Sequence, residues 1–463
     1  MTMPPNPPVP LPRPQIGAVA AMATLLAVAA LAMPTARAAD PGERLRELAA
    51  AVDPAAQRAT IEALVGFGTR HTLSDTASPT RGIGAARRWV QARFAAIAAD
   101  CGGCLEIATP SQTVSGPRVP VPTEVMDVLA IQRGHGDPGR VLLITGHLDS
   151  RVGDIMDFTH DAPGANDDAS GVAAVIEAAR VLSRQRFAAT IVYGVLSGEE
   201  QGLDGGQLLA DYARAQGWRV EAQLNNDIIG NTHGSDGVHD SSVVRVFSEG
   251  TKATESAAQA GRRRYNGGEV DSPSRNLARY MAALAERQLA NLRVEMVYRT
   301  DRFGRGGDQV PMLEAGYPAV RVTEGHENYA RQHQDLRTEG GIVYGDTIAG
   351  VDFDYLAQVT RLNLITLAAL ARAPAPPAGV TIAGAVSPDT TLRWQPPADA
   401  AHCRVWRRRT TDPQWRISRD APPGAAALRL EGIVIDDWFF GVSAVSADGF
   451  ESPVVFPGDA GAF

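Results

Sequence analysis

The feature that most constrains the fold is a repeated alternation of short apolar strands with amphipathic helices in the middle of the chain. Apolar runs of strand length are predicted at residues 141–145, 190–196 and 222–229. Between them, residues 170–183 and 203–216 carry apolar side chains at helical spacing. Strands that alternate with helices form a sheet with both faces covered. The sequence therefore predicts an α/β fold with a mainly parallel mixed sheet sandwiched by helices.

Further predicted helices flank this region on both sides. Residues 41–99 show helical spacing of apolar residues and could cover one face of the sheet, and a last helix is predicted at about residues 353–371. The segment 251–272 is polar and aperiodic, so we expect a long surface insertion there. The chain has 463 residues, more than the roughly 250–300 at which a single core stops growing, so more than one domain is expected.

A proline-rich segment at residues 373–378 ends the alternating pattern and is predicted to be an extended linker. The remaining residues, 379–463, contain short alternating segments separated by turn residues, which predict a small all-β sandwich. This part resembles a fibronectin type III module, with Trp394 early in the sequence and two prolines soon after it. We expect few contacts across the linker, so that residues 39–372 fold without the sandwich.

The N-terminal segment has the layout of a cleavable secretory signal. Residues 16–33 are apolar, Arg13 precedes them, and a small-residue tripeptide ending at Ala38 follows. We predict a signal peptide at residues 1–38 that is cleaved after Ala38, with an uncleaved membrane anchor as the alternative. After cleavage the protein would be secreted or periplasmic, with no stable membrane insertion.

Charge and cysteine content narrow the possible functions. The formal net charge of −8 offers no extended basic surface, so nucleic acid is not an expected partner. Oxidising surroundings outside the cytoplasm would allow Cys101 and Cys104, which two glycines separate, to form a disulfide. Cys403 is then left over and is predicted to be a buried free thiol.

Acidic and imidazole side chains follow the three predicted strands. His147 and Asp149 come after the first strand, Glu199 and Glu200 after the second, and Asp227 closes the third. In open α/β sheets the ligand crevice lies outside the carboxyl ends of the strands. These residues are therefore expected to meet in one crevice.

A loop from Gly164 to Gly171 adds Asp167 and Asp168 immediately before a predicted helix. One aspartate can cap the helix, but two caps are not needed. Carboxylates that cluster in one crevice repel one another unless cations neutralise them, so the sequence predicts a metal site. Imidazole mixed with carboxylate favours zinc or a similar transition ion over calcium.

The ordered motifs H-x-D, G-A-N-D-D-A-S-G, E-E and N-D, followed by a distal histidine, resemble those of the di-zinc aminopeptidases of clan MH. This family includes bacterial leucyl aminopeptidases, glutamate carboxypeptidases and one-zinc glutaminyl cyclases, and the resemblance spans about residues 71–371. It implies two Zn²⁺ ions that share Asp167 as a bridging ligand. His147 and Asp227 would complete one site, and Glu200 and the distal histidine would complete the other.

The resemblance also implies roles for residues that bind no metal. Glu199 would act as the general base, and Asp149 would orient His147 by accepting its second ring N–H. The peptide bond between Asp167 and Asp168 could be cis, as in this family.

The distal histidine has three candidates, His233, His326 and His333. In the family this histidine is followed closely by an aspartate and precedes the last helix, which favours His333. Asp308 lies in a segment that also resembles a family element, and we expect it to be structural or to support a ligand.

Taken together, the motifs predict an exported zinc-dependent aminopeptidase. It would remove N-terminal residues from peptides with a zinc-activated water and Glu199 as general base. The alternatives are a carboxypeptidase or dipeptidase of the same clan, then a glutaminyl cyclase, then a metal-free binding protein on the same fold.

Overall fold

The computed structural model describes residues 1–13 and 40–463. The chain divides into two units, Met1–Ala38 and Ala39–Phe463, and the helices and strands of the described residues all lie in the second unit. The apolar run of the predicted signal peptide and the predicted cleavage point after Ala38 lie outside the described residues. Within the described part of the chain, no helix is long and apolar enough to cross a membrane.

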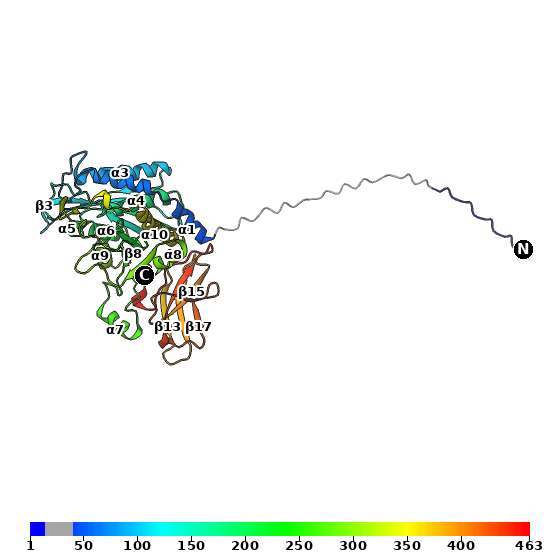
Figure 1. Ribbon diagram of the computed structural model, residues 1–463. Coiled ribbons are helices and arrows are strands. Elements are labelled where there is room, and N and C mark those ends of the chain that lie inside the picture. Colours follow the sequence, from blue (N-terminus) through cyan, green and yellow to red (C-terminus); the bar gives the residue numbers. More distant parts are fainter. Residues whose placement is uncertain (14–39) are drawn as a thin grey trace. The chain divides into compact units, whose positions relative to one another are not determined.

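An eight-stranded mixed sheet forms the centre of the second unit (Figure 1). Its strands are β1 (Glu106–Ala108), β4 (Val128–Gln132), β5 (Asp137–His147), β6 (Ala189–Leu196), β7 (Arg219–Asn226), β8 (Val243–Phe247), β9 (Arg293–Val297) and β10 (Ala319–Glu324). Their order is β1-β4-β6-β5-β7-β10-β8-β9. The middle strands β6, β5, β7 and β10 are parallel, whereas β4 and β8 pair antiparallel with β6 and β10. The three strands that the sequence predicts correspond to β5, β6 and β7, so the predicted fold class is confirmed.

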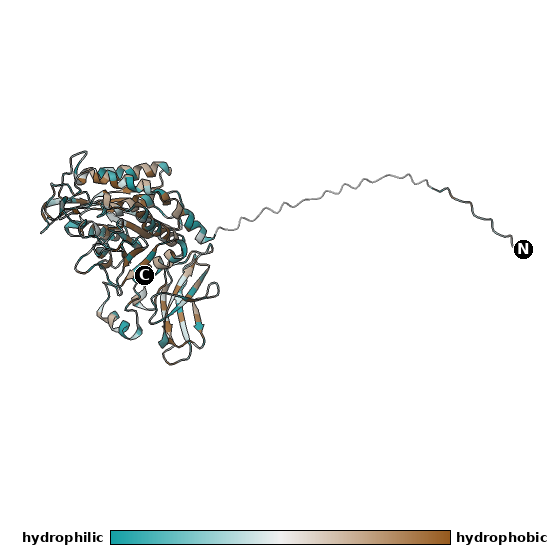
Figure 2. Cartoon of the chain, viewed as in Figure 1, coloured by the Kyte–Doolittle hydropathy of each residue, from teal (hydrophilic) through white to brown (hydrophobic). Residues whose placement is uncertain are grey.

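Helices pack on both faces of this sheet. The larger core, on one face, receives side chains from α1 (Pro41–Ala50), α2 (Pro54–Val65), α3 (Gly82–Asp100), α4 (Ala169–Leu182), α8 (Pro273–Gln288) and α10 (Phe353–Arg372). The smaller core, on the other face, receives side chains from α6 (Asp204–Ala215) and α9 (Gln309–Glu314). Along β5, Leu142 and Ile144 join the larger core while Val141 and Leu143 join the smaller one. Figure 2 shows the hydrophobic residues concentrated in the sheet and on the helix faces that cover it.

Shorter elements connect these layers. They are the hairpins β2 (Ser111–Gly116) with β3 (Val119–Met126) and β11 (Arg337–Glu339) with β12 (Ile342–Tyr344), the helices α5 (Glu199–Gly202) and α7 (Ala257–Asn266), and the 3₁₀ turns η1 (Ile348–Gly350), η2 (Ile435–Asp437) and η3 (Asp459–Gly461). Helix α7 occupies the segment that the sequence predicts as an irregular insertion. All of its residues are at least partly exposed, so the segment is at the surface as expected. The helix itself is held by a capping box between Ser256 and Gln259.

Two small antiparallel sheets follow α10. One contains β13 (Ala378–Ala383), β14 (Thr390–Gln395) and β17 (Ala427–Leu430), and the other contains β15 (His402–Arg409), β16 (Ile417–Asp420) and β18 (Trp438–Val445). Their inward side chains, among them Leu392, Trp394, Val405 and Phe440, form a separate apolar core. The predicted all-β character is confirmed, and the likeness to a fibronectin type III module remains a prediction.

The C-terminal sheets pack tightly against the rest of the second unit (Figure 1). Asp271 is fully buried and accepts hydrogen bonds from Arg279 of α8 at 2.8 Å and from Arg408 of β15 at 2.8 and 2.9 Å. Phe450 belongs to the larger core of the central sheet, and Tyr280 of α8 donates to the backbone oxygen of residue 451. The expectation of few contacts across residues 373–378 is therefore wrong. A proline-rich linker does not determine whether the two parts of the chain that it joins pack against each other. The domain boundaries themselves remain a prediction.

The structure confirms the predicted disulfide and the predicted buried free thiol. Cys101 and Cys104 form a disulfide just after α3. Cys403 is a buried free thiol on β15, inside the apolar core of the C-terminal sheets.

Candidate metal centre

The candidate site lies where three neighbouring strands end. His147 is the last residue of β5, Asp227 directly follows β7, and α5 begins with Glu199 and Glu200 shortly after β6. Because β6, β5 and β7 are adjacent and parallel, these three ends lie at the same edge of the sheet. The structure thus brings together the residues that the sequence predicts at this edge.

Asp167 and Asp168, in the loop before α4, have different structural roles. Asp168 is the N-cap of α4, and its oxygens accept the backbone N–H of Gly171 at 2.9 Å and of His147 at 3.0 Å. The peptide bond between Asp167 and Asp168 is cis. Asp167 faces the site, with Oδ1 at 3.1 Å from His147 Nε2 and Oδ2 at 2.9 Å from His333 Nε2. Asp167 therefore lies between two histidines, as a ligand shared by two metal ions would.

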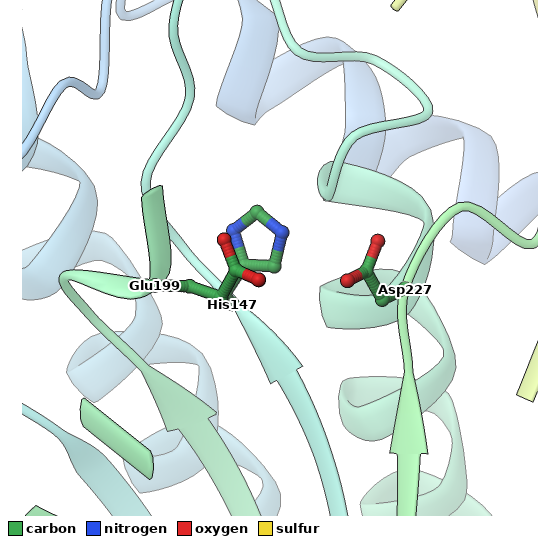
Figure 3. Close-up of side chains that lie close together, drawn as sticks. All are labelled: His147, Glu199 and Asp227. Atoms are coloured by element: carbon green, nitrogen blue, oxygen red, sulfur yellow. The ribbon is translucent and has the colours of Figure 1, made fainter. Parts of the chain in front are cut away.

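The first group of potential metal ligands contains His147, Glu199 and Asp227 (Figure 3). One ligand atom of each residue lies within 4.8 Å of the other two. His147 Nδ1 lies 3.0 Å from the backbone oxygen of Asp149, which can accept the ring N–H. This hydrogen bond would keep the lone pair on Nε2, the nitrogen that faces the site.

The second group contains Asp167, Glu200 and His333, whose ligand atoms lie within the same 4.8 Å limit. His333 Nε2 is 2.9 Å from Asp167 Oδ2 and 2.9 Å from Glu200 Oε1. Arg151 donates to the other oxygen of Glu200 at 2.8 Å. Among the described residues, none makes a hydrogen bond to the buried Oε1. A buried carboxylate oxygen without a hydrogen bond, facing an imidazole and a second carboxylate, fits a zinc ligand.

Burial and crowded charges shift the pKa values of these groups. Burial raises the pKa of Glu199 well above its usual range. His147 lowers this pKa, but the Asp227 carboxylate raises it further. Burial favours the neutral form of His333, but the Glu200 and Asp167 carboxylates outweigh it and raise the pKa of His333 to about 10. A metal ion that binds His333 must therefore displace a proton.

Arg151 contacts His333 as well as Glu200. Its Nη2 lies 2.6 Å from His333 Nδ1, and because a guanidinium only donates, this contact is a hydrogen bond only when His333 is neutral and Nδ1 carries no proton. A metal ion on Nε2 requires the proton on Nδ1, so this contact has to open when a metal binds.

Asp149 supports the site in a different way from the one that the sequence predicts. Its carboxylate Oδ1 is 3.6 Å from His147 Nδ1, and the shorter contact to that nitrogen comes from the Asp149 backbone oxygen. The carboxylate instead accepts the N–H groups of Gly198, Glu199 and Glu200 at 3.0–3.3 Å. Burial raises the pKa of Asp149, but His147 and these hydrogen bonds outweigh burial and hold it below its usual range. Asp149 thus fixes the turn that carries both glutamates.

Three buried residues that the sequence analysis does not single out also position the site. Asp346 accepts the backbone N–H of Asp167 at 2.7 Å. Arg70 donates to three backbone oxygens between residues 148 and 164 and so holds the loop before α4. Arg321 pairs with the Asp227 carboxylate. No local motif surrounds these residues, and each reaches the site only through the tertiary fold.

The other candidate residues lie elsewhere. His326 pairs with Asp236 at 2.8 Å, and His233 stacks on His239 with ring centroids 3.8 Å apart, so neither joins the two ligand groups. Asp308 is fully buried and accepts a backbone N–H of α6 at 3.1 Å, as expected for a structural residue. The structure therefore brings His333, and not His326, to the position of the distal histidine.

A cavity of about 260 Å³ opens over both ligand groups. Besides Asp167, Glu199, Glu200, Asp227 and His333, it is lined by Arg118, Arg151, Gly202, Leu203, Arg302, Gly304, Arg305 and Gly306. Another cavity, of about 320 Å³, lies between α8 and the C-terminal sheets and contains none of the predicted site residues. The cavity over the ligand groups is therefore the candidate substrate site.

Known proteins are similar to this chain in sequence and in fold. The profile of peptidase family M28 matches residues 127–339. A probable zinc metalloprotease from Leptosphaeria maculans is 44% identical over 423 residues, which cover 90% of this chain and 97% of that protein. A probable zinc metalloprotease from Pyricularia oryzae is 43% identical, over 90% of this chain and 85% of that protein.

Solved structures with a fold similar to that of this chain are also known. LapB from Legionella pneumophila matches with a TM-score of 0.51 at 17% identity, over 71% of this chain and 75% of that one. The LapA aminopeptidase from Legionella pneumophila matches with a TM-score of 0.50 at 18% identity, over 71% of this chain and 74% of that one. At these identities the likeness concerns the fold alone.

The covered mixed sheet, the histidine and carboxylate groups at its edge and the zinc metalloprotease relatives define a zinc metallopeptidase. Within that class, the chain belongs to peptidase family M28. The family resemblance that the sequence motifs indicate is confirmed.

Proposed function

We propose that the protein is an exported aminopeptidase that uses two zinc ions to hydrolyse the N-terminal peptide bond of its substrates. One observation carries the two-ion proposal: the two oxygens of Asp167 face two different histidines, His147 and His333, at 3.1 and 2.9 Å. In this proposal His147 and Asp227 hold one ion, Glu200 and His333 hold the other, and Asp167 bridges them. A one-zinc glutaminyl cyclase would not need a carboxylate between two complete ligand groups.

Zinc would supply a nucleophilic water at neutral pH and polarise the scissile carbonyl group. The chain's own residues then have to move the protons. Glu199 lines the cavity beside both ligand groups, and its backbone N–H is held by Asp149. We assign Glu199 the task of taking a proton from the attacking water and passing it to the leaving amine. Glu200, the next residue, is instead directed to His333 and Arg151.

Three observations support export and peptide cleavage. The apolar run at residues 16–33 has the layout of a secretory signal. The relatives from Leptosphaeria maculans and Pyricularia oryzae are described as probable zinc metalloproteases. The Legionella pneumophila LapA structure is described as an aminopeptidase. A carboxypeptidase or dipeptidase of the same family is the second candidate, because the same ligand groups would serve it.

Two measurements test this proposal. Metal analysis of the purified protein should give two zinc equivalents, whereas one equivalent would favour a cyclase. Hydrolysis of peptides with a free amino group, and not of the same peptides with a blocked amino group, would support an aminopeptidase. The opposite preference would replace it by a carboxypeptidase.

Glu199→Gln tests the role of the base. The variant should keep its zinc content while its turnover falls by about 10²- to 10⁴-fold, because it loses a proton acceptor and no assigned ligand. Loss of zinc in this variant would make Glu199 a ligand of the His147 and Asp227 group instead.

A further inference from the structure

We propose that the cavity selects peptides that carry a carboxylate next to the cleaved bond, and that Arg302 and Arg305 bind this carboxylate. The inference rests on the proposed function, because it names the substrate class of the same site. The carboxylate can belong to an acidic side chain or to a free C-terminus close to the bond. Both sources present the same two-oxygen anion to a guanidinium group.

The side chains that line the cavity are mostly charged. Four arginines surround it, and Leu203 contributes the one apolar side chain among the described lining residues. Pockets that bind apolar groups are lined mainly by hydrophobic and aromatic side chains. This cavity is therefore poorly suited to a large apolar side chain and well suited to an anion.

The balance of charge points the same way. The four lining carboxylates are those of Asp167, Glu199, Glu200 and Asp227, all of which the proposed function uses as metal ligands or as the base. Bound cations neutralise carboxylates. In the metal-loaded protein the lining carboxylates would be neutralised, and the arginines would be the charged groups left to face a substrate, with Asp301 and Glu327 pairing with Arg302 and Arg305 from outside the lining.

Arg302 has a donor that lacks an acceptor. Its side chain is only 9% exposed, and it is fixed by Asp301 at 3.2 Å and by the backbone oxygen of Gly306 at 3.2 Å. Within the described residues its Nη1 has no hydrogen-bond acceptor, and Glu327 lies 3.9 Å away. Nη2 is 3.8 Å from Asp227 Oδ2, which places the guanidinium beside the first ligand group. A buried donor without an acceptor is unfavourable, and a small rotation of the guanidinium toward the cavity would let a bound carboxylate accept from it.

Arg305 lies three residues further along the same loop and remains 34% exposed. Glu327 holds it at 2.9 Å and is itself held by Arg245 at 2.7 Å. Burial raises the pKa of Glu327, but the hydrogen bond from Arg245 and nearby charges outweigh it and lower the pKa to about 2. Glu327 therefore stays charged and keeps the arginine loop in place at neutral pH.

Matched substrates test the proposal and separate the two sources of the carboxylate. One pair is the p-nitroanilide of glutamate and that of glutamine, which differ in side-chain charge. The other pair is dialanine and dialanine amide, which differ in C-terminal charge. We expect kcat/KM to be about 10- to 100-fold higher for the charged member of one pair, the range of a hydrogen bond to a charged group. The pair that shows the difference identifies the source.

Variants connect the preference to the arginines. Arg302→Gln and Arg305→Gln should each reduce the ratio of kcat/KM values within the responding pair. Arg302→Lys, which keeps the charge but not the planar fork, should retain part of it. Arg299→Gln is the matched control, because Arg299 is exposed on the same loop and does not line the cavity. It should leave both activity and preference unchanged.

Binding gives a readout that is independent of turnover. Calorimetry with zinc-loaded Glu199→Gln protein should show tighter binding of glutamyl-glutamate than of glutaminyl-glutamine amide, which lacks both kinds of carboxylate, and Arg302→Gln added to that protein should remove the difference. Hydrolysis of peptides with equal kcat/KM in both pairs would overturn the carboxylate proposal and leave the proposed function standing. No hydrolysis of any peptide would overturn the proposed function, and the calorimetric comparison would still decide whether the cavity binds carboxylates.

Discussion

Two buried clusters of charged side chains in this molecule differ in one respect that separates function from structure. At the contact with the C-terminal sheets, the single carboxylate of Asp271 is shared by Arg279 and Arg408, and all three side chains are at most 2% exposed. At the edge of the central sheet, the carboxylates of Asp167 and Glu200 instead meet His333, and Glu200 Oε1 has no hydrogen bond among the described residues. In the first cluster both carboxylate oxygens are bonded by side chains of the same chain, whereas in the second cluster one carboxylate oxygen is left without a hydrogen bond and could bind a cation.

The backbone reinforces this difference. Arg279 also donates to the backbone oxygens of Val270 and Pro413, and Arg408 donates to that of Asp412. This cluster of hydrogen bonds orders the contact between two parts of the chain. At the site, the unsatisfied Oε1 of Glu200 instead faces an imidazole and a second carboxylate. That combination, and not buried charge alone, distinguishes the candidate metal centre from the arginine cluster.

The largest effect should follow from removing the shared ligand of the site. We expect Asp167→Ala to lose both zinc ions and all measurable turnover, because the residue faces both histidines. His333→Ala should lose one ion only, because among the two ligand groups it belongs to the second alone. Metal analysis of the two purified variants checks this. Equal zinc content in both would contradict the bridging role of Asp167.

Changes in the cluster of Asp271, Arg279 and Arg408 should lower the stability of the protein. Asp271→Ala leaves two buried arginines without their carboxylate, and breaking a buried pair in this way costs about 3–5 kcal/mol of unfolding free energy. Chemical denaturation of the zinc-loaded variant checks the value. Asp271→Asn, which keeps an acceptor oxygen, is the control and should lose less. A chain that ends at residue 373 should be destabilised as well, because Phe450 would leave the larger core.

A smaller effect should follow from loosening a ligand without removing it. Asp346 is buried and accepts the Asp167 N–H, so Asp346→Asn should weaken zinc binding by about 10- to 100-fold while the fold persists. Competition with a chelator measures the affinity. Asp240→Asn serves as the control, because Asp240 also accepts a backbone N–H but lies in an exposed turn and does not line the cavity over the ligand groups. Equal zinc affinity in both variants would remove Asp346 from the site.

The smallest effect is expected at an exposed ion pair of the same contact. Arg416 lies 3.1 Å from Glu286 of α8, and both side chains are about 60% exposed. Water and salt screen such a pair, so Arg416→Gln should change the unfolding free energy by less than about 1 kcal/mol. A loss as large as that of Asp271→Ala would mean that the contact is held by its surface and not by its buried cluster.

The sequence predicts much of the fold and of the candidate site because both are encoded locally. The apolar runs that become β5, β6 and β7 and the residues that directly follow them are all short segments. His147, Glu200 and Asp227 could therefore be placed at one edge before any coordinates were known. The loop with Asp167 and Asp168 is also local, and the structure shows which aspartate caps the helix.

The parts that the sequence does not predict depend on contacts between distant segments. Asp346, Arg70 and Arg302 carry no motif, and each acquires its position from tertiary packing. The contact between α8 and the C-terminal sheets is not predicted for the same reason. The composition of a proline-rich linker does not indicate which surfaces pack together. Helix α7 is an exception, since the capping box at Ser256 and Gln259 is a local signal that was available.

The spread of the ligand groups along the chain also has a consequence for biosynthesis. His147 and His333 stand 186 residues apart, and Asp167 contacts both. At a synthesis rate of about 5–20 residues per second, the last proposed ligand leaves the ribosome roughly 10–40 s after the first. A nascent chain can therefore not complete the second ligand group during that interval. In the proposed mechanism the peptidase stays inactive until nearly three quarters of it has been made, with no need for a separate inhibitory segment.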